Sequence, residues 1–375
     1  MSDDSGDAGP DEALAGGRLT IDLAALADNW RILAGRVRPG TRTAAAVKGD
    51  GYGIGLTEAG KALAAAGCDV FFVALPEEGV RLRRALPSAT IYVLAGLSEQ
   101  AVPAFVANRL WPVLNTSAEV DEWIAVRRNG ATTGAAVHVD TGMNRLGLTL
   151  AEGLALGTAR ERVAALSPTL VMSHLACADT PSHPLNARQL ARFREVRAAF
   201  PGVAASLANS AGVALEPDYH FDLARPGIAL YGAAAGDAVP PLRPVVTAEA
   251  RVLQVREVTA GDPVGYGATE MRTGPARLAI LGVGYADGYH RAASSSDGRP
   301  GARVFIGGRF APLIGRVSMD LVAVDVTGLA GVKRGDWAEL FGSNVPVDEV
   351  AKHAGTIGYE LLTGLGRRYA RRYVG

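Results

Sequence analysis

The chain has 375 residues, with 38 lysines and arginines balanced by 38 aspartates and glutamates, so it carries no net charge at neutral pH. A balanced chain offers no net field to nucleic acid or an anionic membrane, which favours a small neutral or zwitterionic substrate. Its two cysteines, Cys68 and Cys177, form no CxxC pair and no Cys/His cluster. We therefore expect no disulfide framework, no metal site and a reducing, cytoplasmic location.

The first residues, 1–16, are acidic and rich in glycine, serine and aspartate. This is the reverse of the basic start and apolar run of a signal peptide, and it predicts a disordered tail. No later stretch reaches eighteen uninterrupted apolar residues, so we expect no membrane-spanning helix. At this length two domains are expected to follow the tail.

Residues 17–243 alternate short apolar runs with longer segments of helical periodicity. The runs predicted as strands are 43–48, 69–75, 90–96, 110–115, 134–140, 170–176, 205–209 and 227–232. The segments predicted as helices are 56–67, 76–86, 99–108, 118–130 and 186–200. Continuously apolar strands joined by helical crossovers indicate a parallel sheet. Eight such units predict a (β/α)8 TIM-like barrel, with an open doubly wound sheet as the alternative.

The pattern changes after the proline-rich segment 238–245. The remaining predicted strands are 246–258, 276–285, 302–308, 321–328 and 337–342. Turn signals separate them and few windows have helical periodicity. Residues 244–375 are therefore predicted to form a second, mostly β domain, so the fold class is α/β plus β.

Lys48 ends the first predicted barrel strand, which places it on the rim where barrel enzymes carry their catalytic groups. The alternative is a lysine that merely extends from a strand end into solvent. Alternate glycines from Gly49 to Gly55 let the backbone approach a ligand closely, and Tyr52 among them offers a hydroxyl to a phosphate. A partly desolvated lysine is a nucleophile that can anchor a carbonyl cofactor through a Schiff base.

Four other polar residues lie at or near later predicted strands: Arg145 just beyond the fifth, His174 at the sixth, Ser210 at the seventh and Arg225 near the eighth. Each has a structural alternative, as a satisfied core histidine, a helix cap or a surface ion pair. The carboxyl ends of parallel strands meet at one rim of a barrel, so all four are predicted to converge with Lys48. Their joint position favours a functional site.

Nine motifs spread along almost the whole chain resemble the alanine racemases, pyridoxal 5'-phosphate enzymes of fold type III. They are "AAVKGDGYGIG", "DTGMNRLG", "MSHLACAD", "NSAG", "RPGIALYG", "VGYGAT", "GYADGY", "GRVSMD" and "TIGYE". The resemblance implies a head-to-tail homodimer with shared active sites, in which Lys48 forms the internal aldimine and Tyr266 comes from the partner subunit. It implies interconversion of L-alanine and D-alanine by two-base proton transfer at Cα, with Lys48 serving the D-enantiomer and Tyr266 the L-enantiomer.

Further roles are implied only by this resemblance. Arg225 is expected against the pyridine nitrogen, hydrogen-bonded to His174, where it keeps that nitrogen largely unprotonated. The residues expected to bind the phosphate are Tyr52, Ser210, Gly227, Ile228 and Tyr359. The residues expected to contact the substrate are Arg145, Met319 and Tyr285, the last two from the partner subunit.

Two parts of the chain depart from the family pattern. Gly49, Gly51 and Ile54 stand where relatives often carry alanine, alanine and histidine or leucine, which we expect to loosen the loop. His138 stands where some members carry a carbamylated lysine that holds the active-site arginine. We therefore expect an anion or a carboxylate beside Arg145; the alternative is that His138 is an inward-facing residue satisfied by a neighbouring carbonyl.

Three other functions are alternatives to alanine racemisation. The nearest is a broad-specificity amino-acid racemase that uses the same cofactor, whose members are usually exported. A pyridoxal-phosphate-binding homeostasis protein shares the barrel but has no β domain and no counterpart of Tyr266. A fold type III decarboxylase typically presents a glutamate to the ring nitrogen, whereas this chain presents Arg225.

Overall fold

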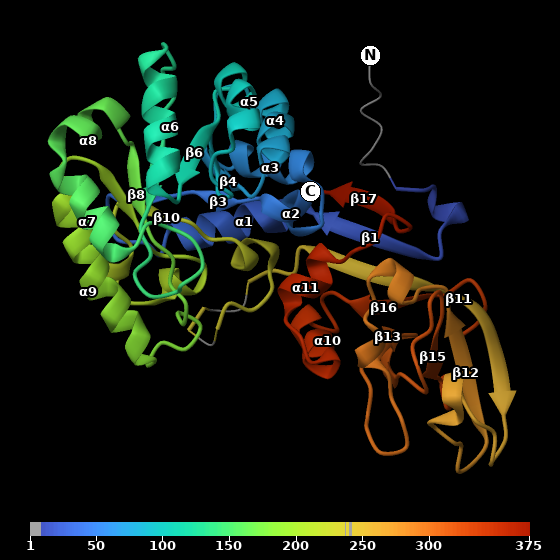
Figure 1. Ribbon diagram of the computed structural model, residues 1–375. Coiled ribbons are helices and arrows are strands. Elements are labelled where there is room, and N and C mark those ends of the chain that lie inside the picture. The colour runs from blue at the N-terminus through green and yellow to red at the C-terminus, as the bar shows by residue number, and fades with distance from the viewer. Residues whose placement is uncertain (1–8, 237, 240–241) are drawn as a thin grey trace. The chain divides into compact units, whose positions relative to one another are not determined.

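The computed structural model describes residues 9–236, 238–239 and 242–375, and their contacts form two compact units (Figure 1). We call residues 26–230 together with the described part of 234–242 the barrel unit. The described residues of 1–25, 231–233 and 243–375 form the β unit. Each unit is described by itself.

Seven parallel strands follow one another around the barrel unit in chain order. They are β3 (Ala45–Ala46), β4 (Val70–Val73), β5 (Thr90–Val93), β6 (Trp111–Leu114), β7 (Ala136–His138), β8 (Leu170–Met172) and β9 (Ala204–Ser206). Strands β4, β7 and β8 are buried at every position, because helices cover one side of a barrel strand and the filled interior covers the other.

The strand β10 (Leu223–Ala224) closes the barrel and pairs in parallel with β2 (Arg42–Thr43). On one side the amide of Arg225 donates to the carbonyl of Ala208, and on the other the amide of Ala44 donates to Ala224. The closed (β/α)8 barrel is therefore confirmed over the open sheet. The eighth strand was predicted too late, because Ile228–Tyr231 form a 3-10 helix; a short buried apolar run does not distinguish strand from helix.

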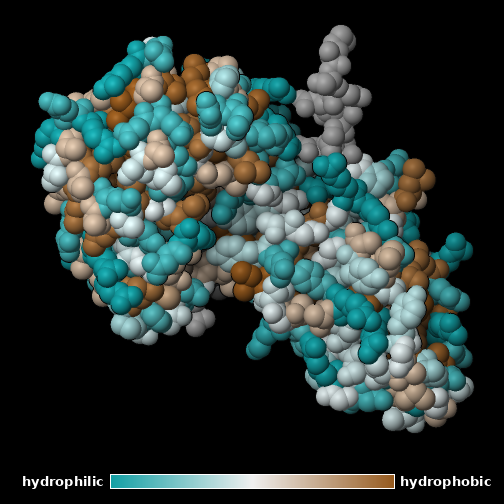
Figure 2. All heavy atoms as spheres, viewed as in Figure 1, coloured by the Kyte–Doolittle hydropathy of each residue, from teal (hydrophilic) through white to brown (hydrophobic). Residues whose placement is uncertain are grey.

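Helices surround these strands, and all five predicted ones are present (Figure 1). They are α3 (Leu56–Ala65), α4 (Pro76–Ala85), α5 (Val102–Ala107), α6 (Ser117–Arg128) and α9 (Pro184–Ala199). Four more were not predicted: α1 (Leu23–Ala34), α2 (Lys48–Tyr52), α7 (Leu150–Thr158) and α8 (Arg160–Leu166). Figure 2 shows hydrophilic residues along the outer helices of this unit, with hydrophobic residues between them. In the described ranges no helix is both long and apolar enough to cross a bilayer.

The β unit is built on the long strand β11 (Val246–Val258). Its first half pairs with β1 (Gly17–Asp22) and β16 (Trp337–Phe341), and its second half pairs with β12 (Ala276–Leu281). The other elements are β13 (Arg303–Ile306), β14 (Arg309–Pro312), β15 (Val322–Asp325), β17 (Ala370–Val374), α10 (Val347–Ala354) and α11 (Gly358–Thr363). Side chains of β1 and β15 alternate between the core and more accessible positions, as one-sided sheets do.

The structure differs from the predicted boundaries near the N-terminus. Residues 17–22 were placed in the barrel domain with no strand predicted, yet they form β1, in which Leu19 pairs with Ala248 of β11 and Arg371 of β17, so β1 belongs to the β unit. Much of the predicted tail, residues 1–8, lies outside the described residues. Within the rest of that tail Glu12–Leu14 form a short 3-10 helix, and Glu12 forms an ion pair with Arg18 at 2.9 Å.

Candidate active site

Lys48 emerges from the carboxyl end of the first barrel strand, as the sequence predicted. The amide of Val47 still donates to Phe72 of β4 at 2.9 Å, and Lys48 is the next residue. The side chain is half-buried, and its amine has no hydrogen bond or ion pair with any residue that the structure describes. Burial lowers the pKa of this amine, the positive charge of Arg145 lowers it further, and the carboxylate of Glu78 opposes both. Lys48 is thus poised as an amine nucleophile.

The chain after Lys48 makes one turn of left-handed helix. Gly49, Asp50 and Gly51 have φ values of 65°, 54° and 64°, and Tyr52 follows at 52°. The turn is closed by the amide of Gly51 donating to Val47 at 2.9 Å. L-residues are strained in this conformation, whereas glycine adopts it freely and aspartate is tolerated better than most. The two glycines that depart from the family pattern therefore suit the backbone found here.

Tyr52, Ser210 and Gly227 come together as the sequence predicted. The Ser210 hydroxyl accepts hydrogen bonds from the amides of Gly227 at 2.8 Å and Ala229 at 3.3 Å. A Cβ atom on Gly227 would lie only 2.2 Å from the Tyr52 hydroxyl, so only glycine allows this approach. Ile228 follows in the same buried turn. Two hydroxyls and adjacent amides form a cradle of neutral donors, which we call the hydroxyl cradle.

Arg225 is a buried cation at the end of β10. Its guanidinium donates to the Ser206 hydroxyl and to the carbonyl of Ser173, and it lies 5.8 Å from the centre of the Phe72 ring. Burial lowers its pKa to about 9, which leaves the group charged at neutral pH. Because a guanidinium has five N–H donors, further donors have no acceptor among the described residues.

His174 is placed with the other strand-end residues, but the expected hydrogen bond to Arg225 is not formed in the described part of the chain. Burial and the positive charges of Arg225, Arg145 and Lys48 hold the pKa of His174 well below its ordinary value. Its imidazole is therefore neutral in the working range of pH. Gln189 fixes the local backbone by donating to the His174 carbonyl at 2.8 Å.

Arg145 is exposed, and no carboxylate of the described residues forms an ion pair with it. The carboxylate partner that we expected is thus not supplied by this part of the chain. His138 is instead buried and lies 2.7 Å from the amide oxygen of Asn115, a neutral partner. Burial lowers the pKa of His138 to about 4, and the charge of Arg225 contributes. The loop that carries Arg145 is held by Asp140, which accepts three backbone amides from residues 142–144.

The β unit presents three predicted residues on its surface: Tyr266, Tyr285 and Met319 are 69%, 42% and 53% exposed. The segments of Tyr285 and Met319 lie together, because the amide of Ala286 donates to the Met319 carbonyl at 3.0 Å. Tyr266 lines a pocket of about 570 Å³. Tyr359, the remaining predicted residue, lies in α11 and is partly exposed.

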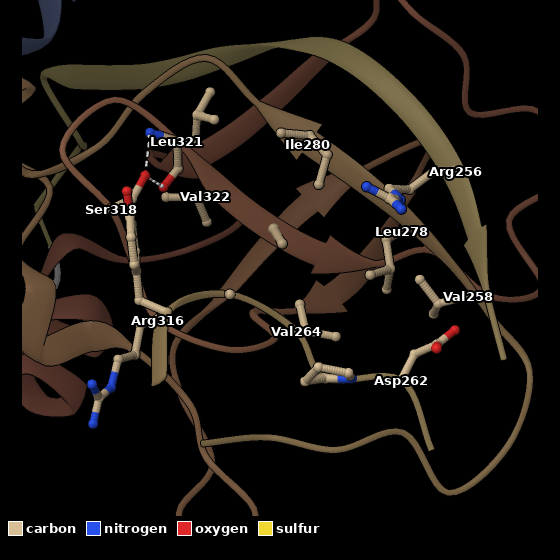
Figure 3. A pocket seen from close by; sticks show the side chains of 14 residues that line it. Arg256, Val258, Asp262, Val264, Leu278, Ile280, Arg316, Ser318, Leu321 and Val322 are labelled. Carbon is tan, nitrogen blue, oxygen red and sulfur yellow. Dashed lines mark hydrogen bonds between the residues drawn. The ribbon is translucent and has the colours of Figure 1, made fainter. Parts of the chain in front are cut away.

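The pocket lies wholly within the β unit (Figure 3). Its wall includes Val264, Leu278 and Ile280, whose aliphatic side chains surround the same space, while the guanidinium of Arg316 is directed away from them. The Ser318 hydroxyl donates to the carbonyl of Leu321 at 3.0 Å and closes the turn that contains Met319. Tyr266 thus lies beside an apolar hollow of its own unit.

Sequence reasoning missed the residues that support the site, above all Glu78, Asn115 and Asp140. Glu78 could have been noticed as the glutamate at the third position of a helix that starts with proline, a capping pattern. Asp140 follows a strand and precedes a glycine turn, where aspartate commonly accepts backbone amides. No sequence signal pairs Asn115 with His138, because they lie on different strands.

A barrel with a strand-end lysine and a hydroxyl cradle, joined to a separate β domain, defines a two-domain barrel enzyme. Two family models cover this architecture: "Alanine racemase, N-terminal domain" matches residues 21–235, and "Alanine racemase, C-terminal domain" matches residues 245–373. The chain belongs to the alanine racemase family.

Known proteins resemble the chain over its full length. It is 52% identical to the alanine racemase of Rhizobium meliloti, over 98% of this chain and 99% of that protein. It is 49% identical to the biosynthetic alanine racemase of Agrobacterium fabrum, over 100% and 99%. The crystal structure of alanine racemase from Bartonella henselae with covalently bound pyridoxal phosphate superposes with a TM-score of 0.89 at 39% identity, covering 96% of this chain and 100% of that one.

Proposed function

We propose that the protein is an alanine racemase that interconverts L-alanine and D-alanine with pyridoxal 5'-phosphate held on Lys48. The observation that carries the proposal is the half-buried Lys48 amine with a lowered pKa, on the same short loop as the Tyr52 hydroxyl of the cradle. The relatives that match the whole chain are alanine racemases, which does not favour the broad-specificity alternative.

The residues of the barrel unit fit this cofactor. Tyr52, Ser210 and the amide of Ile228 would bind its phosphate. Gly227, whose amide donates to Ser210, keeps the cradle open because it has no side chain. The unused N–H donors of Arg225 would meet the ring nitrogen. Because a guanidinium retains its protons at working pH, it would leave that nitrogen without a proton of its own.

The bound cofactor acidifies the Cα proton of the amino acid attached to it, and the protein supplies the groups that move this proton. One base alone would mostly return the proton to the face that it left, so inversion needs a group on each face. The Nζ atom of Lys48 serves one face and the hydroxyl of Tyr266 serves the other. General acid–base groups of this kind contribute factors of about 10² to 10⁴ in rate.

Exposed groups of the chain would contact the substrate. The guanidinium of Arg145, free of any ion pair in the described residues, would attract the carboxylate of alanine. Met319 offers a backbone group in the turn closed by Ser318, and Tyr285 lies beside it and narrows the space for larger side chains. His174 stays neutral and adds no further charge to the cluster of Lys48, Arg145 and Arg225.

A homodimer is part of the proposal. Three predicted site residues of the β unit, Tyr266, Tyr285 and Met319, are exposed in the single chain, and Leu321 beside them is 40% exposed. Large exposed aromatic and apolar residues mark interaction surfaces. We assign this surface to the barrel unit of a second copy, whose site it completes.

Mixing two inactive variants tests the shared site. Lys48→Ala chains and Tyr266→Phe chains should each be nearly inactive alone. After random subunit exchange half of the dimers are mixed and each mixed dimer holds one complete site, so about a quarter of the parent activity should return. No recovery after exchange demonstrated by native mass spectrometry would show that each site is built within one chain.

The proposed reaction is tested by incubating the cofactor-loaded protein with single L-amino acids and measuring D-enantiomers by chiral chromatography. D-Alanine should form, with larger amino acids at least about tenfold slower. Equal rates with L-lysine or L-arginine would instead support the broad-specificity racemase. Release of CO2 without any D-amino acid would support the decarboxylase.

The closer match among paralogues favours D-alanine biosynthesis. The biosynthetic enzyme of Agrobacterium fabrum is 49% identical to the chain, and the catabolic enzyme of the same organism is 44% identical. Cys68 and Cys177 are free thiols, as a reducing compartment favours, so the cytoplasm remains the expected location.

A further inference from the structure

Glu78 is a buried carboxylate in the first turn of α4 that receives four backbone amides. One oxygen accepts from Ala74 at 2.7 Å and Leu75 at 3.2 Å. The other accepts from Gly49 at 2.7 Å and Asp50 at 3.2 Å. The carboxylate therefore joins the ends of two neighbouring barrel strands, β3 and β4.

Helix capping explains the hydrogen bonds of only one of the two carboxylate oxygens of Glu78. A glutamate at the third helical position commonly accepts the amide that precedes its own helix, as Glu78 does with Leu75. The other oxygen reaches the two residues directly after Lys48. These residues are in the left-handed conformation, in which their amides leave the direction of the strand ladder and need another acceptor.

The same loop is fastened at a second point by the neighbouring helices. The carboxylate of Asp50 accepts the amide of Leu56 at 3.1 Å and forms an ion pair with Arg81 of α4 at 3.2 Å. Helix α4 thus holds the left-handed turn through Glu78 and Arg81. At one end of that turn is Lys48, and at the other is Tyr52 of the hydroxyl cradle.

We propose that Glu78 is a positioning residue for Lys48: through the amides of Gly49 and Asp50 it sets where the lysine amine lies relative to the hydroxyl cradle. The inference rests on the proposed function, because it takes Lys48 as the cofactor lysine. Glu78 also acts on Lys48 electrostatically, because its negative charge raises the pKa of the Lys48 amine, whereas burial lowers it. Loss of the carboxylate should thus change both cofactor binding and its pH dependence.

The test compares Glu78→Gln with Glu77→Gln, the same chemical change one residue earlier on the same helix. Glu77 forms an ion pair with Arg81 at 3.8 Å, and its side chain is 68% exposed. Pyridoxal 5'-phosphate is added to each apoprotein, and the dissociation constant and the pH profile of attachment are followed by absorbance. Borohydride reduction and peptide mapping identify the labelled lysine.

Glutamine places an NH2 group opposite one pair of backbone donors and carries no charge. Hydrogen bonds to a charged group contribute enough that the dissociation constant of Glu78→Gln should rise about tenfold or more. The midpoint of its attachment profile should move to lower pH, whereas Glu77→Gln should match the parent in both. Identical behaviour of the two variants would overturn the inference.

Two further measurements keep the outcome decisive. If Glu78→Gln does not fold, as judged by circular dichroism, Glu78→Asp takes its place, because aspartate keeps the charge but is too short to reach both pairs of amides. Its dissociation constant should rise while the pH midpoint stays, and an unchanged constant would overturn the inference. If the parent itself is not labelled on Lys48, the proposed function fails first, whatever the Glu78 variants do.

Discussion

The two units hold their candidate residues in opposite ways. In the barrel unit Arg225, Ser210 and His138 are buried among strand ends and each has a hydrogen-bonding partner. In the β unit Tyr266 and Met319 are mostly exposed. The barrel unit therefore fixes its candidate residues within one chain, whereas the candidate side chains of the β unit leave most of their surface exposed.

Sheet architecture explains this contrast. The parallel strands of the barrel are covered on both sides, so polar groups reach a ligand only where the strands end. The β unit has one-sided strands such as β1. Tyr266 and Tyr285 lie on turns that follow β11 and β12, and Met319 lies in the turn before β15. Changes at the buried residues of the barrel unit should thus disturb cofactor binding, whereas a change at Tyr266 should disturb catalysis alone.

The largest effect is expected for Lys48→Ala. Loss of the amine removes both the covalent attachment and one of the two bases, so racemisation should fall by at least about 10³-fold. The measurement is D-alanine formation together with the absorbance of bound cofactor. The control is Lys61→Ala, because Lys61 is an exposed lysine paired with Glu58 at 3.2 Å. If borohydride reduction of the Lys48→Ala protein with pyridoxal 5'-phosphate still labels a lysine, Lys48 is not the residue that binds the cofactor.

The next effect, for Tyr266→Phe, separates catalysis from stability. The ring is retained and the hydroxyl is exposed, so racemisation should fall about 10²- to 10⁴-fold without a change in the free energy of unfolding. Tyr92→Phe is the opposite case, because Tyr92 is buried and its hydroxyl lies 3.1 Å from Thr169 in the barrel. It should lose about 1 kcal/mol of stability and keep its activity. Denaturant titration and chiral chromatography measure the two quantities.

Gly227→Ala tests the hydroxyl cradle. The added methyl group would lie 2.2 Å from the Tyr52 hydroxyl, so either the tyrosine moves or the cradle opens. Overpacking of this kind costs about 1 to 3 kcal/mol, which corresponds to roughly a tenfold to hundredfold weaker binding of pyridoxal 5'-phosphate. Gly298→Ala in the β unit is the control, because no atom lies within 4 Å of its added methyl group. Equal affinities of both variants would place the phosphate elsewhere.

Periodicity alone predicted most of the barrel, because covered parallel strands are continuously apolar and their helices repeat every three to four residues. It misplaced the eighth strand, since the buried run that begins at Gly227 fits a strand and a 3-10 helix equally well. Residues 17–22 were included in the barrel domain without a predicted strand. A strand's sheet is fixed by distant pairing, such as that of Leu19 with Ala248, which a local pattern does not show.

The sequence predicted those site residues that lie at strand ends. Lys48 and Ser210 follow buried strands, so the fold alone brings them to one rim. The partners of Arg225 and His138 were not predictable, because they depend on rotamers and on side chains from other strands, such as Ser206 and Asn115. The exposure of Tyr266 was likewise hidden, since a turn sequence does not show which surface it faces.

The smallest expected effect concerns His138 and acid stability. Burial lowers its pKa to about 4 in the folded protein, below the value of about 6.5 in the unfolded chain. As the pH falls from about 7 to about 5.5, the unfolded chain therefore binds more protons at this residue than the folded protein, and stability is lost. His138→Gln removes this titration, so its free energy of unfolding should fall by about 1 kcal/mol less than that of the parent over the same range. His183→Gln, at the exposed start of α9, should retain the parental slope in urea titrations at several pH values. A His138→Gln slope equal to that of the parent would mean that the imidazole is not held neutral inside the barrel. The contrast between the enclosed residues of the barrel unit and the exposed residues of the β unit would then lose this support.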